Sequence, residues 1–109
     1  MWIFAVEGFV SVVEVRGHPD QLMVRGRKRV DVAAWARLVP GRVKVRQTPL
    51  ADYPWRFSTT RKKFAPAIAR VVAGIRYPNF KAAVGHADPE RSRAYMEVWS
   101  TMGEFGAVR

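Results

Sequence analysis

Two short segments in which basic residues alternate with other residues place the strongest constraint on how this chain folds. They span residues 22–29 and 42–46. Successive side chains of a β-strand point to opposite faces, so each segment is predicted to be a strand with one cationic face. Val24 in the first segment and Val43 in the second would then point into the core. The alternating basic residues are Arg25, Arg27, Arg29, Arg42, Lys44 and Arg46.

Most of the positive charge lies in the middle of the chain. Thirteen of the 19 Lys and Arg residues fall within residues 16–63, beside three Asp, and the formal net charge is +10. Net charge governs association rather than fold, and a charge of this sign suits nucleic acid, an acidic protein surface or an anionic membrane. Arg outnumbers Lys fourteen to five. That bias suits bidentate contacts to phosphate or carboxylate, and a GC-rich genome would explain it equally well.

Length and composition predict one domain over residues 1–109. The absence of cysteine excludes a disulfide framework and a thiolate zinc site, and it fits a reducing compartment. Residues 1–15 lack a basic start and carry Glu7 and Glu14, which favours a strand over a signal peptide. No run approaches the roughly 18 apolar residues of a membrane span. We therefore expect a soluble, cytoplasmic protein with no membrane partner, and a homodimer stays open.

Strands are expected at residues 2–15, 22–28, 43–47 and 55–59, with a bulge, bend or turn at Gly8. Helices are expected after Asp31 as N-cap, from about Thr60, over residues 80–84, and after Asp88 as N-cap. Proline suits only a first helical turn, so Pro66 predicts a helix start near Ala65 or a distorted first turn. The helical stripes predict a buried set consisting of Trp35, Phe64, Ile68, Val72, Tyr95, Val98 and Trp99.

The predicted order of elements is ββ-α-ββ-α-α-α. Paired strands with grouped helices indicate the α+β class, with an antiparallel sheet of about four strands and helices on one face. The other face would be open and would carry the six alternating basic residues, with Arg16 and Arg56 as further candidates.

Several segments resemble a family of small bacterial proteins of unknown function. They are residues 1–3, 8–13, 22–27, 52–56, 77–81 and 95–99, in the same order along the chain. The resemblance implies no activity, cofactor or catalytic residue. The chain departs from that family at Pro66 and in its basic middle.

Residues suited to catalysis or metal binding are scarce. His18 and His86 lie in no zinc-binding spacing, and the phosphate-loop, dinucleotide and nucleophile-elbow motifs are absent. Asp52-Tyr53 could form an acid–base pair, but an Asx-turn beside a packed Tyr ring is the favoured interpretation. We predict no enzyme activity, no catalytic residue, no cofactor and no metal.

The leading hypothesis from sequence is therefore a non-enzymatic protein that binds nucleic acid through its cationic sheet face without sequence preference. Stacking of bases would need aromatic residues on the same face. Trp2 and Phe4 could supply them if Ile3 and Ala5 point inward, a register that the sequence leaves open. The alternative is a protein-interaction module, such as an inhibitor or an accessory factor of host or phage origin, that docks on an acidic protein.

Overall fold

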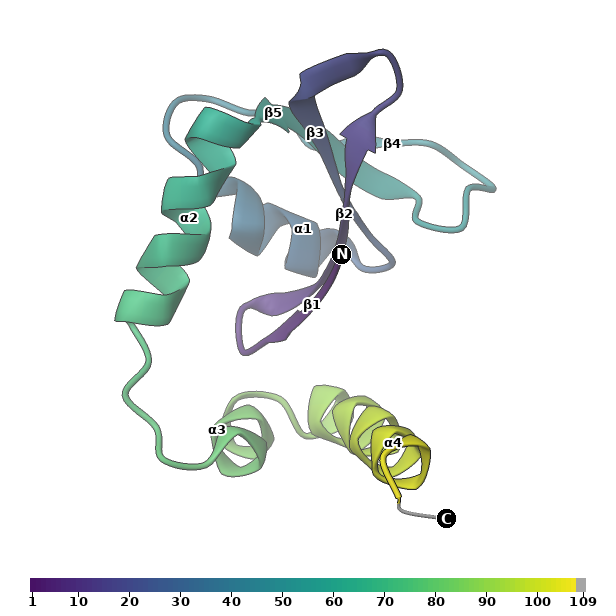
Figure 1. Cartoon of the computed structure of the whole chain (residues 1–109), viewed down its shortest axis with the longest axis vertical. Coiled ribbons are helices and arrows are strands. Elements are labelled where there is room, and N and C mark those ends of the chain that lie inside the picture. Colours follow the sequence, from purple (N-terminus) through teal and green to yellow (C-terminus); the bar gives the residue numbers. More distant parts are fainter. Residues whose placement is uncertain (108–109) are drawn as a thin grey trace. The chain divides into compact units, whose positions relative to one another are not determined.

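The computed structural model describes residues 1–107 and confirms the α+β class, with an antiparallel sheet and helices packed on it (Figure 1). Its strands are β1 (Trp2–Ala5), β2 (Gly8–Val15), β3 (His18–Gly26), β4 (Arg46–Gln47) and β5 (Trp55–Thr60). Its helices are α1 (Arg29–Ala36), α2 (Arg61–Ala73), α3 (Phe80–Ala87) and α4 (Pro89–Phe105).

The chain divides into two compact units, Met1–Ile75 and Arg76–Arg109. The first unit contains the sheet with α1 and α2, and the second contains α3 and α4, which pack on each other. Folding of residues 1–109 as one domain stays a prediction. Among the helices described in residues 1–107, none has the length and apolar character needed to cross a membrane.

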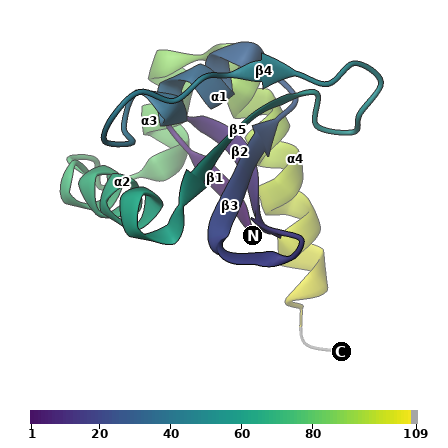
Figure 2. The same cartoon turned by 90° about the horizontal axis from the view of Figure 1, so that it is seen from above.

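The sheet has the strand order β1-β2-β3-β5-β4, and all neighbours are antiparallel. A two-residue connection, Val6-Glu7, joins β1 to β2 and pairs Ala5 with Gly8. Helix α1 lies in the connection from β3 to β4. The loop between β4 and β5 projects beyond the sheet (Figure 2).

The start of β2 is locked to α1 through Gly8. Its φ of 147° disfavours any residue with a Cβ, and a Cβ built there would lie 2.8 Å from the Cβ of Asp31. The backbone N–H of Phe9 donates to Oδ2 of Asp31 at 3.0 Å, and Nε1–H of Trp35 donates to the carbonyl oxygen of Gly8 at 3.2 Å. These contacts make Asp31 a buried tertiary acceptor.

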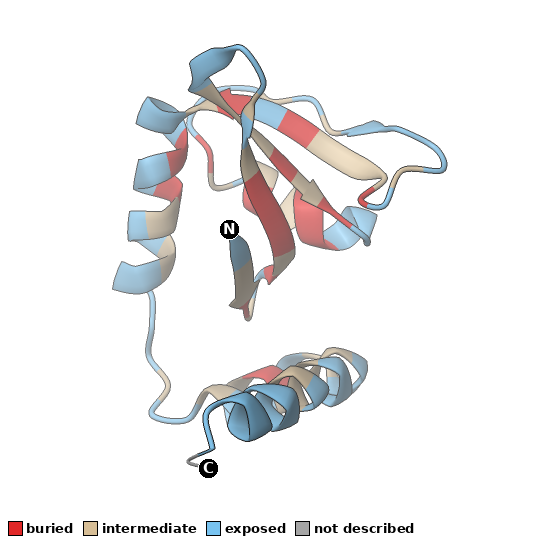
Figure 3. Ribbon diagram, turned by 45° about the vertical axis from the view of Figure 1, so that its right-hand side comes forward, coloured by how far each residue is buried: buried red, intermediate tan, exposed pale blue. Residues whose placement is uncertain are grey.

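One face of the sheet forms the core of the first unit with α1 and α2. Val10, Val24 and Phe57 of the strands have no exposed surface, and α1 contributes Trp35 while α2 contributes Phe64. The rings of Trp35 and Phe64 lie 5.8 Å apart. Helix α2 has its buried residues on the side toward the sheet and its exposed residues on the other side (Figure 3). Burial of these aromatic and aliphatic side chains is what stabilises the sheet.

Several local predictions are wrong. The first cationic strand ends at Gly26, so Arg29 begins α1, and Lys28 rather than Asp31 occupies the N-cap position. Of the predicted strand 43–47, Arg46–Gln47 alone is regular. Val43 and Val45 still pack against the core from the irregular segment before β4.

Helix ends followed the sequence more closely. Thr60 caps α2 by accepting from the N–H of Lys63, so α2 begins five residues before Pro66 and not near Ala65. Asp88 caps α4 as predicted, because its Oδ1 accepts from the N–H of Arg91 at 3.1 Å.

The predicted buried set is confirmed at Trp35 and Phe64, which are buried, whereas Ile68, Tyr95 and Val98 are half-buried. It is wrong at Val72 and Trp99, which are 61% and 59% exposed. Each residue belongs to an apolar stripe along its helix, and that stripe is wider than the part of the helix surface that is buried. Val72 and Trp99 lie in the part that stays exposed.

Candidate nucleic-acid interface

Three arginines lie directly opposite one another on three neighbouring strands. The register pairs Arg25 of β3 with Arg56 of β5, and Arg56 with Arg46 of β4. Residues paired across antiparallel strands point to the same face of the sheet. Arg25, Arg56 and Arg46 therefore form one row, here called the arginine row.

The same line of pairing continues to the other edge of the sheet. Arg25 pairs with Ser11 of β2, and Ser11 pairs with Trp2 of β1. Four inter-strand steps of about 4.8 Å place Trp2 about 19 Å from Arg46 across the sheet. The structure thus settles the register that the sequence left open, and it puts Trp2 on the face that carries the arginine row.

This face is the opposite of the one that α1 and α2 cover. Val24 and Phe57 precede or follow Arg25 and Arg56 in sequence, and both are fully buried in the core. Alternation along each strand turns the arginines to the other side. We call that side the arginine face, and it includes Trp2, Phe4, Phe9, Ser11, Arg25, Arg46 and Arg56, with Val13, Met23 and Ser58 further along the same strands.

An aromatic patch formed by Trp2, Phe4 and Phe9 occupies the β1–β2 end of the arginine face. Phe4 and Phe9 are cross-strand partners, and their rings are stacked with centroids 4.6 Å apart and an interplanar angle of 15°. Trp2 meets Phe9 edge to face at 6.5 Å. Phe4 and Phe9 are half-buried, whereas Trp2 is 66% exposed.

Tyr53 connects the aromatic patch to the basic residues. Its buried ring lies 6.4 Å from that of Phe9, and the guanidinium carbons of Arg25 and Arg27 lie 5.0 and 5.3 Å from its centroid. Arg27 also pairs with Asp52 at 3.1 Å. The Tyr53 ring packs as the favoured interpretation predicted, and the carboxylate of Asp52 holds a neighbouring cation. This packing limits the conformations open to both arginines.

None of the three arginines of the arginine row forms an ion pair with a carboxylate in the part of the chain that the structure describes. Arg25 donates to Oγ of Ser11 at 3.4 Å and Arg56 donates to the carbonyl oxygen of Tyr53 at 2.8 Å, whereas the side chain of Arg46 makes no contact of this kind within residues 1–107. The Nε atoms of Arg25 and Arg56 are buried without a hydrogen-bond acceptor. Like charges directly opposite on neighbouring strands destabilise a sheet. An anion bound over the row would relieve that repulsion.

The structure brings together some of the predicted site residues and separates others. Arg25 and Arg46 lie in the arginine row, and Arg27 adjoins it through the Tyr53 ring. Arg29 lies elsewhere, 5.7 Å from the ring of Trp55, which packs against the helix-covered core. Arg42 and Lys44 are exposed in the irregular segment before β4, so no strand aligns them with the row.

Sequence reasoning gave Arg56 too little weight and missed Phe9. Both depend on cross-strand register. The signal that could have found Phe9 is the two-residue hairpin connection Val6-Glu7, because loop length fixes which residues pair. The place of Arg56 in the arginine row depends on β5 lying between β3 and β4, and no local sequence pattern reveals that strand order.

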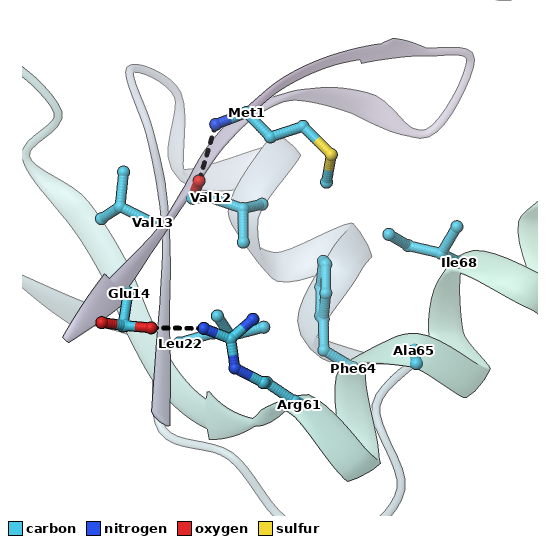
Figure 4. A pocket seen from close by; sticks show the side chains of 9 residues that line it. All are labelled: Met1, Val12, Val13, Glu14, Leu22, Arg61, Phe64, Ala65 and Ile68. Atoms are coloured by element: carbon cyan, nitrogen blue, oxygen red, sulfur yellow. Dashed lines mark hydrogen bonds and ion pairs between the residues drawn. The ribbon is translucent and has the colours of Figure 1, made fainter. Parts of the chain in front are cut away.

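A pocket of about 350 Å³ lies on the other side of the sheet, between β2, β3 and the start of α2 (Figure 4). Apolar side chains such as Leu22 and Ile68 line most of it, and an ion pair between Glu14 and Arg61 closes one end. None of the predicted site residues lines it. The pocket is thus separate from the arginine face.

The histidines do not form a site with other polar groups. His18 is exposed at the start of β3, and His86 is exposed near the end of α3. Among the described residues, no group of three or more His, Asp or Glu side chains could hold a metal ion. The arrangement with the clearest chemistry is therefore the combination of cationic row and aromatic patch.

Comparison with known proteins adds no family to these observations. Family models, curated proteins and solved structures give no match to this chain. The resemblance to a family of small bacterial proteins stays a prediction, and the functional conclusion rests on the geometry of the arginine face.

Proposed function

We propose that this protein binds nucleic acid, without catalysing a reaction, through the arginine face of its sheet. The observation that carries the proposal is the arginine row, in which Arg25, Arg56 and Arg46 stand directly opposite one another and, within residues 1–107, form no ion pair with a carboxylate. Guanidinium groups bind phosphate oxygens bidentately, and each neutralised phosphate releases counterions. A cytoplasmic location, as expected from the sequence, fits such a ligand.

The aromatic patch gives nucleic acid a second contact beside the arginine row. Nucleic-acid bases fit the patch because every base has a face that stacks on an aromatic ring. Carboxylates of an acidic protein would satisfy the arginine row equally well, and exposed tryptophan beside arginine also suits a protein interface, so nuclease treatment is needed to distinguish the two ligands. Binding is expected to be tolerant of sequence, since contacts to phosphates carry no sequence information.

The test is a charge reversal at two exposed positions, Arg27→Glu with Arg46→Glu, measured by fluorescence anisotropy on a labelled oligonucleotide. The expected result is a loss of affinity of more than tenfold with an almost unchanged melting temperature, because loss of the Arg27–Asp52 ion pair and relief of the repulsion between Arg46 and Arg56 act in opposite directions. The matched control is Arg37→Glu with Lys62→Glu, which makes the same change in net charge on α2 and at the end of α1. Full affinity in the first variant, or equal losses in both, would overturn the proposal.

A capture experiment from the native host separates nucleic acid from an acidic protein partner. Immobilised protein is incubated with lysate with and without nuclease. Bound material that disappears after nuclease treatment supports the proposal. A partner protein that resists nuclease, and is lost in the Arg27→Glu, Arg46→Glu variant, would assign the arginine face to protein binding instead.

A further inference from the structure

We infer that the ligand is single-stranded nucleic acid, whose bases stack on the aromatic patch while its phosphates lie along the arginine row. The inference rests on the proposed function and makes it more specific. The observation behind it is the line of pairing Trp2–Ser11–Arg25–Arg56–Arg46, which joins an exposed indole to three guanidinium groups on one sheet face.

The aromatic patch is arranged to present ring surface. Trp2 is 66% exposed although tryptophan is among the largest apolar side chains. Its orientation is supported from below, because Phe9 meets it edge to face at 6.5 Å and Phe4 stacks on Phe9 at 4.6 Å. A base that stacks on the indole would therefore meet a surface already held in place, with little ordering cost on binding.

A duplex offers the aromatic patch much less than a single strand does. Its bases are paired and stacked on one another, so their faces are unavailable to a side chain, and a duplex could make phosphate contacts alone. Unpaired bases can turn toward the sheet. Trp2 and Arg25 are two inter-strand steps apart, about 10 Å, so neighbouring nucleotides of one strand can reach both.

Tyr53 supports the basic end in the same way that Phe9 supports the aromatic end. Its buried ring contacts Arg25 and Arg27 and also lies 6.4 Å from Phe9. The two ends are thus parts of one continuous contact network. This continuity distinguishes the arginine face from a charged surface with an unrelated exposed tryptophan nearby.

Direct binding measurements test the inference with four probes: a twelve-nucleotide oligo(dT), oligo(rU) of the same length, a duplex of matched length, and a twelve-unit abasic deoxyribose-phosphate strand. We expect at least one of the base-bearing single strands to bind about tenfold or more tightly than the duplex and the abasic strand. Preference for oligo(rU) would assign RNA, preference for oligo(dT) would assign DNA, and equal binding would assign a ligand whose sugar is not recognised. Equal affinity for single strand and duplex would overturn the inference.

The variant Trp2→Ala should weaken binding of the preferred single strand by about fivefold or more, since one base loses its stacking partner. Trp2→Phe should restore most of the affinity. Binding of the abasic strand should not change. The matched control is Trp99→Ala, which removes another exposed tryptophan, 59% exposed on α4, and should leave binding intact. Circular dichroism and melting checks confirm that each variant is folded.

The two proposals can fail separately. Unchanged affinity in Trp2→Ala, together with a large loss in Arg27→Glu, Arg46→Glu, would overturn base stacking and leave nucleic-acid binding through the arginines in place. Unchanged affinity in the double charge reversal would overturn the proposed function itself.

Discussion

The two faces of the sheet come from the same strands and carry opposite chemistry. Phe57 has no exposed surface and lies in the core, whereas Arg56, its neighbour in sequence, lies in the arginine row. Alternation of side chains lets each strand contribute to both faces, and each substitution falls on one of them. Stability and binding should therefore separate at positions one residue apart, with core residues controlling stability and residues of the arginine face controlling binding.

The largest expected effect is on the helix-covered face. Phe57→Ala should lower the free energy of unfolding by about 3–5 kcal/mol, because it leaves a cavity among buried side chains that cannot collapse fully. Urea denaturation measures this loss. The fraction of molecules that remains folded should bind oligonucleotide with normal affinity. A loss below about 1 kcal/mol would show that this face is not the core.

Gly8 contacts α1 on the helix-covered side and also begins the strand that positions Phe9 on the arginine face. Gly8→Ala should therefore lower both stability and binding. A Cβ would lie 2.8 Å from the Cβ of Asp31, at a φ that favours glycine, and relief would have to shift the β1–β2 hairpin or α1. We expect a loss of about 2 kcal/mol or more in unfolding free energy and weaker stacking at Trp2.

The control for Gly8→Ala is Gly103→Ala on α4, where a Cβ meets nothing within 4 Å. It should stabilise the helix by up to about 1 kcal/mol through higher helix propensity. Equal effects of the two substitutions would contradict the close approach between Gly8 and α1.

A substitution in the second unit tests whether stability and nucleic-acid binding are also independent there. Asp88→Ala removes the acceptor for the N–H of Arg91 and should cost α4 about 1 kcal/mol, while Asp88→Asn should keep much of the cap. Amide hydrogen exchange in the first turn of α4 measures the effect. Oligonucleotide affinity should not change, and a parallel loss of binding would place α4 in the interface.

The smallest expected effect is also the one with an unusual sign. Arg46→Glu replaces a like-charged cross-strand pair with an opposite-charged one, because Arg46 faces Arg56. Stability should rise by about 0.2–1 kcal/mol while nucleic-acid affinity falls. Thermal denaturation and anisotropy on the same sample measure both. A fall in stability would mean that no repulsion exists in the arginine row.

Local patterns predicted the fold class and the helix caps whose partners lie nearby in sequence. Asp88 and its helix start were found because the acceptor and the N–H it binds lie three residues apart. Asp31 was misassigned because its partner, the N–H of Phe9, lies 22 residues away and belongs to a hairpin. A local cap signal and a tertiary contact look alike in sequence.

The sequence predicted that the candidate site is a cationic sheet face, but it identified only some of the residues on that face. Alternation identified Arg25 and Arg46 correctly as residues of one sheet face. The alternating pattern extends to Arg29, but β3 ends at Gly26 and Arg29 begins α1, so alternation placed Arg29 on the wrong element. Trp2 and Phe9 required the register of β1 on β2, which is fixed by a hairpin connection and by packing of Gly8 on α1.

Phosphate binding by the arginine row is tested most directly by the salt dependence of oligonucleotide affinity in the wild type and in Arg46→Glu. Three phosphate contacts along the arginine row predict a log–log slope of about −2 for a single strand, or about a 20-fold loss of affinity from 50 to 200 mM salt. In Arg46→Glu the slope should fall to about −1.4 or less in magnitude. An identical slope in the two proteins would contradict the claim that the arginine row binds phosphate.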